Sequence, residues 1–513
     1  MKNLSYVSAL IPVIVLIILL SFNLYVFGDL SLEGANQLAL LFAASIAFII
    51  SLLNGVKWKE LLEGIKKSIG ATTSAMIILL LIGALTGTWL ISGIVPAMIY
   101  YGLQILNPDI FLFATCIICA IVSLSTGSSW STIATVGIAL LAIGNTLGVS
   151  NGITAGAIIS GAYFGDKMSP LSDTTNLAPA MSGVRLFSHI KYMMYTTIPS
   201  FSITLLIFLF IGLKYDSQIS SDQIQEMLSV LSKSFNITPL LFIAPILVII
   251  MIIKKIPAIP SLFFGIFIGG VFSVIFQSHI INELSNKEKS NLKTTYQVVI
   301  NSMSSELNFT NINRKINNII PIEYSNSNNT VQIQYDSAMK LDQDHPAKIE
   351  ANKRQDLLKS GGMSGMLNTI WLIICAMCFG GVMESGKLLE RISRPIINRA
   401  KKTGNLITST SGTCIFFNLT TGDQYLSIVV PGRMFANAYN ESGLAPENLS
   451  RTLEDSGTVT SVLVPWNTCG AAQSAVLGVA TLTYLPFCFF NIISPFMTIV
   501  YAYMGFKIKK LNK

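Results

Sequence analysis

The stretch Gly165-Asp-Lys-Met-Ser-Pro-Leu-Ser-Asp-Thr-Thr-Asn-Leu-Ala-Pro179 is a polar segment between apolar runs. Its prolines, Pro170 and Pro179, each lack a backbone N–H donor, and the neighbouring hydroxyl and amide side chains can bond the backbone groups thus freed. We therefore predict that a helix opens here. An opened helix presents carbonyl oxygens beside hydroxyls and carboxylates, which are the ligands that hard cations prefer. The candidate ligands of this segment are Asp166, Ser169, Asp173, Thr174, Thr175 and Asn176.

The sequence around this segment is that of a membrane protein. Of its 513 residues 51% are hydrophobic and 12% are charged, whereas soluble domains carry about 25% charged residues. Apolar runs of about 20 residues, the length of a helix that crosses a bilayer, recur from end to end. We predict an all-α polytopic membrane protein with roughly 11 to 13 transmembrane helices. The first run, Ser5 to Phe27, is too long for a signal peptide and is expected to be a retained span.

Some apolar runs are too short to cross a bilayer alone. They are Val95 to Leu106, Ile153 to Phe164 and Gly457 to Val464. Backbone that is not part of a full helix survives at membrane depth only where protein or a water-filled cavity satisfies it. We therefore predict that these runs are broken helices or re-entrant hairpins.

The chain also resembles itself. Leu124-Ser-Thr-Gly-Ser-Ser-Trp-Ser-Thr-Ile-Ala-Thr-Val-Gly137 aligns without gaps to Leu419-Thr-Thr-Gly-Asp-Gln-Tyr-Leu-Ser-Ile-Val-Val-Pro-Gly432. A second polar segment follows each of them, Asp166 to Asn176 in the first half and Asp455 to Asn467 in the second. Interrupted segments at corresponding places are typical of transporters built from repeats, whose substrate site lies between the repeats. These segments add the candidate ligands Ser125, Thr126, Asp423, Asp455, Thr458, Asn467 and Thr468.

This pattern predicts three parts. Residues 1–276 form a first transmembrane half and residues 360–513 a second, expected to be related as inverted repeats. Residues 277–359 are rich in Asn, Ser, Lys and Glu and contain no apolar run of spanning length. We interpret them as an external insertion, either flexible or a small folded unit, rather than a substrate-binding domain.

The acids of the polar segments are expected to differ in role. Lys167 follows Asp166 directly, so Asp166 is the more plausible structural ion pair. Asp173 lies among hydroxyls without an adjacent base and is the more plausible ligand. A carboxylate in a low-dielectric site favours its neutral form, so protons compete there with cations, and such competition is sufficient for antiport. Of the neighbours Glu454 and Asp455, Glu454 is the more plausible loop acid at the membrane surface.

The net charge of +8 reports topology rather than binding to nucleic acid, because the basic residues gather in short loops. Placing these clusters in the cytoplasm, among them the Lys57 to Lys67 loop, puts both termini inside and the insertion outside. His189 is then expected in a basic cytoplasmic loop, with His279 and His345 in the insertion. None of the histidines is therefore predicted to relay protons within the membrane.

The cysteines show spacings shared with redox and zinc sites, Cys116-x-x-Cys119 and Cys375-x-x-Cys378. Both pairs lie in apolar helical runs, where a three-residue step puts them on one face as small packing residues. The sequence carries no haem, Rossmann or phosphate-loop signature. We expect no cofactor and no catalytic residue.

In the polar segments described above, the chain resembles the NhaC-type Na⁺/H⁺ antiporters, a family that also includes malate/lactate antiporters. The resemblance covers nearly the whole chain except 277–359. It implies a multi-pass exchanger of the bacterial inner (plasma) membrane that moves Na⁺ or Li⁺ against H⁺. It also implies re-entrant hairpins and a homodimer, as in the wider ion-transporter superfamily. The matching blocks are Gly165 to Asn176, Ser125-Thr-Gly-Ser-Ser-Trp130, Glu454-Asp-Ser-Gly-Thr458 and Pro465-Trp-Asn467.

Two other functions remain open. The same fold can exchange an organic anion such as malate or lactate, coupled to ions. Such a site needs positive partners, and Lys167, Arg433 or helix N-termini are the candidates. A membrane enzyme or receptor that uses the insertion is disfavoured, because the insertion shows no pairing of a nucleophile with a base.

Overall fold

The computed structural model describes residues 4–27, 31, 33–105, 107–214, 221–287, 290–319, 322–326, 329–342, 344–345, 348, 358–399 and 402–511. Residues 277–359, the predicted insertion, therefore lie in part outside the described residues.

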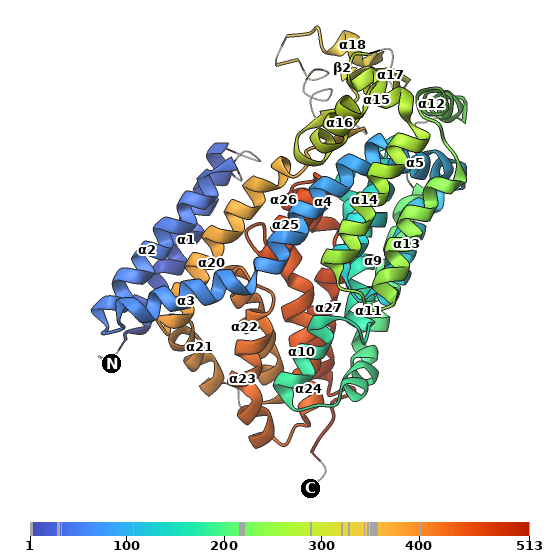
Figure 1. Cartoon of the computed structure of the whole chain (residues 1–513). Coiled ribbons are helices and arrows are strands. Elements are labelled where there is room, and N and C mark those ends of the chain that lie inside the picture. Colours follow the sequence, from blue (N-terminus) through green and yellow to red (C-terminus); the bar gives the residue numbers. More distant parts are fainter. Residues whose placement is uncertain are drawn as a thin grey trace.

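Helices dominate the structure (Figure 1). The first part contains α1 (Tyr6–Phe27), α2 (Ala35–Leu53), α3 (Trp58–Ala71), α4 (Thr73–Ile91), α5 (Ile94–Ile105), η2 (Pro108–Ile110), α6 (Phe111–Thr126), α7 (Ser129–Thr132), the π-helical η3 (Ile133–Gly137), α8 (Ile138–Thr146), α9 (Asn151–Met168), α10 (Asp173–Ser182), α11 (Leu186–Lys214), α12 (Ser221–Ser234), η4 (Pro239–Phe242), α13 (Ile243–Ile253) and α14 (Ala258–Phe276). The middle part contains α15 (Ser278–Leu284), α16 (Leu292–Ser304), β1 (Leu307–Asn308), α17 (Thr310–Ile319), β2 (Ile322–Asn326), β3 (Asn329–Ile333), α18 (Tyr335–Ala338) and β4 (Lys359–Ser360). The last part contains η5 (Ser364–Met366), α20 (Leu367–Ser385), α21 (Leu388–Arg399), α22 (Thr403–Thr421), α23 (Leu426–Glu441), α24 (Pro446–Leu453), the π-helical η6 (Glu454–Thr458), η7 (Ser461–Leu463), α25 (Thr468–Leu477), α26 (Thr481–Tyr484), η8 (Leu485–Phe487) and α27 (Phe489–Met504).

The described residues include 8 helices long and apolar enough to cross a membrane, or up to 10 if each sharply bent pair counts as one span. Many large apolar side chains on their outer faces are exposed, such as Phe22 of α1 and Phe267 of α14. Exposed apolar surface of this extent suits lipid rather than water. The chain is therefore a multi-pass α-helical membrane protein, and α9, α22, α23 and α25 are shorter or more polar helices inside it.

The Lys57 to Lys67 segment is not a loop as expected, but belongs to helix α3. Its apolar residues recur at helical spacing, and Leu61 is fully buried while Lys57 and Lys59 are exposed. The chain bends at Thr72 into α4. Figure 1 shows α3 running from the lower end of α4 across the lower part of α20.

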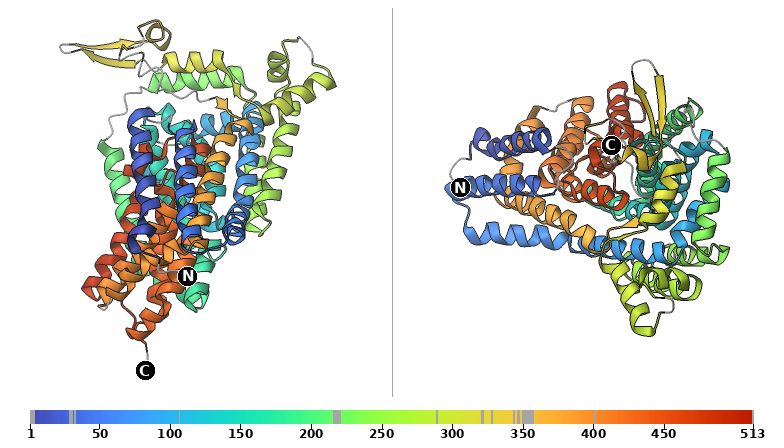
Figure 2. Two further views of the ribbon diagram at one scale, coloured as in Figure 1. Left: turned by 90° about the vertical axis from the view of Figure 1, so that its left-hand side faces the viewer. Right: turned by 90° about the horizontal axis from the view of Figure 1, so that it is seen from above.

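The middle part forms a cap at one end of the molecule, and its described residues are folded (Figure 2). Strands β1 and β4 pair antiparallel, with Leu307 opposite Ser360, so the segment after α16 lies beside the segment where the chain leaves the cap. Helix α16 lies directly on α4, where a Cβ on Gly87 would stand 1.7 Å from the carbonyl oxygen of Ser302. The start of α1 and the segment after α27 lie at the opposite end of the molecule (Figures 1 and 2).

The aligned segments of the two halves form matching helical hairpins. Helix α6 ends at Gly127 (φ +69°) and α22 ends at Gly422 (φ +65°), and these glycines are aligned in the repeat. In each hairpin the side chain of the residue after the glycine accepts from the N–H three residues later. The Oγ of Ser128 accepts from the N–H of Ser131 at 3.2 Å, and the Oδ1 of Asp423 accepts from the N–H of Leu426 at 2.8 Å. The local repeat thus exists in structure, and the inverted relation of the halves stays a prediction.

Candidate functional site

The predicted opening between the prolines is confirmed, because α9 ends at Met168 and α10 begins at Asp173. Side chains of the segment satisfy the freed backbone groups. The hydroxyl of Thr175 donates to the carbonyl of Lys167 at 2.9 Å. The amide of Asn176 donates to the carbonyls of Pro170 and Ser172 at 3.0 and 2.7 Å. Thr175 and Asn176 therefore hold the break open rather than face a ligand.

The tip of the first hairpin lies against this break. A Cβ on Gly127 would stand 2.6 Å from the Cβ of Leu171 and 2.8 Å from its carbonyl carbon, so only glycine allows this approach. The Oδ2 of Asp166 accepts from the N–H of Ser129 at 3.1 Å and from its hydroxyl at 2.7 Å. Asp166 is 8% exposed. Its carboxylate thus lies at the N-terminus of the helical segment that begins with α7, where negative charge is stabilised.

The second half repeats this arrangement. Gly422 lies against the break after η7, with a Cβ position 3.2 Å from the carbonyl oxygen of Trp466. The N–H of Thr468 donates to the carbonyl of Gly422 at 2.8 Å. Asn467 caps α25 by accepting from the N–H of Cys469 at 3.0 Å. Each hairpin tip is therefore joined to the second break of its own half.

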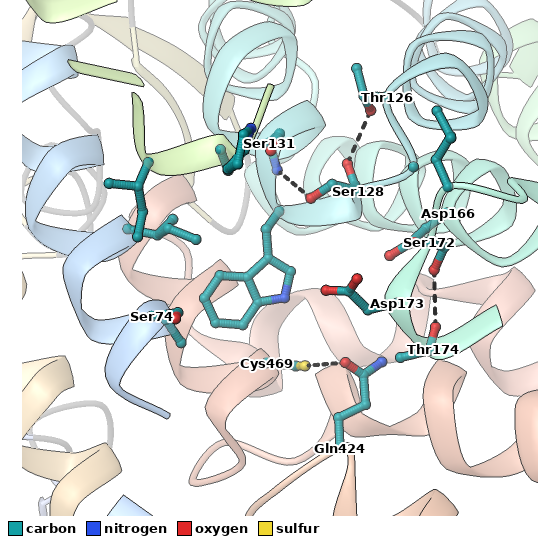
Figure 3. Close-up of a pocket in the computed structure, with 18 of the residues that line it drawn as sticks. Ser74, Thr126, Ser128, Ser131, Asp166, Ser172, Asp173, Thr174, Gln424 and Cys469 are labelled. Carbon is teal, nitrogen blue, oxygen red and sulfur yellow. Dashed lines mark hydrogen bonds between the residues drawn. The ribbon is translucent and has the colours of Figure 1, made fainter. Parts of the chain in front are cut away.

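The two hairpin tips and the two breaks beside them meet at one pocket of about 540 Å³ (Figure 3). Three carboxylates line it, those of Asp166, Asp173 and Asp423, with hydroxyl groups between them. In the close-up the carboxylate of Asp173 projects into the pocket, with Gln424 and Cys469 on the wall across from it. Six predicted residues line the pocket: Thr126, Asp166, Asp173, Thr174, Asp423 and Thr468.

The other predicted residues do not line the pocket: Ser125, Ser169, Thr175, Asn176, Asp455, Thr458 and Asn467. The hydroxyl of Ser125 donates to the carbonyl of Ile121 in its own helix at 2.8 Å. The Oγ of Ser169 accepts from the N–H of Leu171 within the break. Ser125 and Ser169 thus bond to the backbone beside the pocket.

The expected pairing of Asp166 with Lys167 is wrong. Lys167 and Asp455 are fully buried, and the ammonium of Lys167 forms an ion pair with Asp455 and donates to Ser494 at 3.0 Å. Asp455 also accepts hydrogen bonds from Thr196, at 2.8 Å, and from Thr498. Consecutive residues of a helix point about 100° apart, so Lys167 turns away from Asp166 towards α27. Asp455 therefore forms the ion pair with Lys167 outside the pocket, and Asp166 lines the pocket.

Two further expectations are corrected. His189 lies not in a loop but in α11, where it is fully buried and its Nδ1 lies 2.9 Å from the hydroxyl of Ser450. Glu454 is not a surface acid, because none of its surface is exposed. It belongs to η6. The side-chain amides of Asn418 and Gln424 donate to the backbone carbonyls of Gly457 and Thr458 in this turn.

The pocket also contains residues that were not predicted as ligands. They include Ser128, Trp130, Gln424 and Tyr425. Trp130 aligns with Tyr425 in the repeat, and Ser128 aligns with the predicted Asp423, so the repeat itself was a signal for these tip positions. Lys255 also lines the pocket, from the connection between α13 and α14, and no motif marked it. Neither Lys167 nor Arg433, the basic residues considered for an anion, lines the pocket.

Comparison with known proteins shows the family. A sequence model described as the Na⁺/H⁺ antiporter family matches residues 161–286 and 335–506. The Na⁺/H⁺ antiporter NhaC of Alkalihalophilus pseudofirmus is 35% identical over 455 residues, which are 89% of this chain and 87% of that protein. The chain belongs to the Na⁺/H⁺ antiporter family.

Another relative is named for different substrates. The malate-2H⁺/Na⁺-lactate antiporter of Bacillus subtilis is 34% identical over 96% of this chain and 92% of its own length. A solved structure, MtrF of Neisseria gonorrhoeae, covers 97% of this chain and 95% of its own at 13% identity and a TM-score of 0.35. That likeness is too distant to inform the site of a Na⁺/H⁺ antiporter family member.

Proposed function

We propose that this protein exchanges Na⁺ for H⁺ across the bacterial inner membrane, with both ions competing for the carboxylates of the pocket. The observation that carries the proposal is the meeting of Asp166, Asp173 and Asp423, from breaks in both halves, in one pocket. Membership of the Na⁺/H⁺ antiporter family supports Na⁺ and H⁺ as the two exchanged ions.

The chemistry of the pocket wall suits this exchange. Carboxylate and hydroxyl oxygens are ligands for Na⁺ and Li⁺, while the same carboxylates accept protons. Like charges that share a low-dielectric site disfavour ionisation of every member together. Either a cation or a proton relieves this repulsion, so occupancy by one excludes the other and couples their movements.

The test is ion flux in proteoliposomes that contain the purified protein. An outward Na⁺ gradient should acidify the lumen, because each Na⁺ that leaves is exchanged for H⁺ that enters, with Li⁺ as a second substrate and K⁺ as a negative control. Flux of Na⁺ that leaves the lumenal pH unchanged, with no organic anion present, would refute the proposal.

Ion-coupled exchange of an organic anion is the second candidate. Lys255 lines the pocket and offers a positive partner for a carboxylate substrate, and about 540 Å³ is ample for a small dicarboxylate. A relative carries malate and lactate in its name. Flux of labelled malate or lactate that requires Na⁺ and is lost in Lys255→Gln would favour this function. Exchange that proceeds fully without any organic anion excludes it as the sole activity.

The cytoplasmic location of both termini and a homodimeric assembly are further parts of the proposal. Support for the orientation comes from the basic clusters, which lie at the end opposite the cap. The connection that carries Lys255 lies one helix length from the cap, at the other end of α14. The pocket is then open towards the cytoplasm.

A further inference from the structure

Glu454 is a buried acid that does not line the pocket. It lies in the π-helical turn η6, and none of its surface is exposed. Within the part of the chain that the structure describes, its carboxyl has no well-formed hydrogen bond, and the hydroxyls of Thr458 and Thr174 lie beside it. A buried carboxylate without a partner is strongly disfavoured, so a positive charge must accompany it.

The nearest basic side chains form no ion pair with Glu454 among the described residues. The charge of Lys167 stabilises an ionised Glu454, but Lys167 forms its ion pair with Asp455, the next residue. Arg451, one turn earlier, lies over the ring of Tyr192 and donates to the carbonyl of Lys507 at 3.1 Å, while its Nε and Nη2 have no hydrogen-bond partner among the described residues. Asp166 is also close and has the same sign as Glu454. An ionised Glu454 thus has no ion-pair partner of its own among these neighbours.

The neighbourhood of Glu454 supplies hydroxyl oxygens. Thr458 lies one helical turn later, and its buried hydroxyl lies beside the Glu454 carboxyl. The side chain of Thr174 lies beside the Glu454 carboxyl and also lines the pocket. A monovalent cation thus has a carboxylate and a hydroxyl to bind, and Thr174 separates this position from the pocket. Turns of π-helix occur frequently at functional sites.

We propose that Glu454 and Thr458 form an inner site that binds one further monovalent cation of the transport cycle, Na⁺ or H⁺. The inference rests on the proposed Na⁺/H⁺ exchange and adds one charge to what each cycle carries. The site is separate from the pocket carboxylates, so its loss removes one cation and leaves the others.

The test counts cations on the purified protein. Radioactive Na⁺ bound at saturation, and protons released on binding, are measured for the wild-type protein, Glu454→Gln and the control Glu441→Gln, whose side chain is exposed. An amide of the same shape can be buried without a counter-charge, so Glu454→Gln should fold. It should lose one cation equivalent per protein, as bound Na⁺ or as released proton, while Glu441→Gln matches the wild-type count.

The variant Thr458→Val separates the two cations. A bound Na⁺ requires the hydroxyl oxygen and its affinity should fall at least tenfold, whereas a bound proton needs only the carboxyl and the counts stay unchanged. In proteoliposomes the reversal potential of Glu454→Gln should shift by the loss of one charge per cycle. Equal Na⁺ and proton counts for Glu454→Gln and wild type overturn the inference, even if transport is lost. A wild-type protein that does not couple Na⁺ to H⁺ overturns the proposed function instead.

Discussion

Lys167 and Asp455 form a fully buried ion pair that connects α9 of the first half to η6 of the second. Thr196, Ser494 and Thr498 complete the hydrogen bonds of the pair. The pair fixes the two segments that carry Asp166 and Glu454 relative to each other. Its contribution is therefore to the geometry around the pocket and not to the ligands in it.

Lys167→Met should destabilise the protein by about 3 to 5 kcal/mol, because it leaves the Asp455 carboxylate buried and unpaired. The double variant Lys167→Met/Asp455→Asn should recover most of that loss, since the amide can still accept from Thr196 and Thr498. Thermal unfolding in detergent measures both. A double variant no more stable than the single one would contradict the pairing.

Asp173→Asn should reduce proton-coupled Na⁺ uptake by roughly tenfold or more, because intramembrane carboxylates carry such coupling and an amide cannot titrate. The side chain lies in the pocket, with its Oδ2 3.5 Å from the hydroxyl of Tyr425, so the fold should survive. Asp109→Asn, exposed in η2, is the matched control. Near wild-type flux in purified Asp173→Asn would transfer the coupling role to Asp166 or Asp423.

Transport should respond to pH as a competition. Lowering the pH protonates the pocket carboxylates, so the apparent KM for Na⁺ should rise, by about tenfold per pH unit where one proton displaces one Na⁺. The maximal rate should change little, because saturating Na⁺ displaces the protons. Initial rates of Na⁺ uptake at several pH values measure both constants. A maximal rate that falls with pH at constant KM would argue against shared carboxylates.

Gly127→Ala should lower both stability and transport. A left-handed backbone costs a residue with a Cβ about 1 to 2 kcal/mol, and the new Cβ would also collide with the backbone of Leu171. Gly183 has φ +72° and no atom within 4 Å of its Cβ position, so Gly183→Ala isolates the backbone strain alone. Thermal unfolding and flux of the two variants should separate the strain from the loss of contact between hairpin and break.

The orientation can be measured by cysteine labelling in intact cells. A cysteine placed at the exposed Lys293 of the cap should react with an impermeant maleimide. A cysteine at the exposed Lys59 of α3 should react only after permeabilisation. The reverse pattern would invert the topology. The native cysteines give little background, since only Cys378 is not fully buried.

The sequence predicted the breaks because their signals are local. Proline, glycine and hydroxyl residues act on their own backbone, so the opening before Asp173 and the aligned tips at Gly127 and Gly422 were readable from the chain. The partner of Lys167 was not readable. Adjacency suggested Asp166, but side-chain direction on a helix and the position of Asp455, 288 residues away, decided the pairing.

Burial was equally hard to predict for single polar residues. Glu454 and His189 both have polar and basic residues near them in the sequence, and such neighbours are typical of loops. Tertiary packing nevertheless buries both side chains. The insertion was understood from its composition as a separate unit. Its contact with α4 depends on a glycine, Gly87, inside an apolar run where nothing marks it as an interface.

The size of the pocket has a consequence for selectivity. A space of about 540 Å³ has room for many water molecules, since about 10 to 15 Å³ of such volume holds one. At the proposed site a cation would therefore enter with much of its hydration shell and exchange it for the oxygens of the wall. Discrimination between Na⁺, Li⁺ and K⁺ would then depend on the free energy of dehydration at the carboxylates.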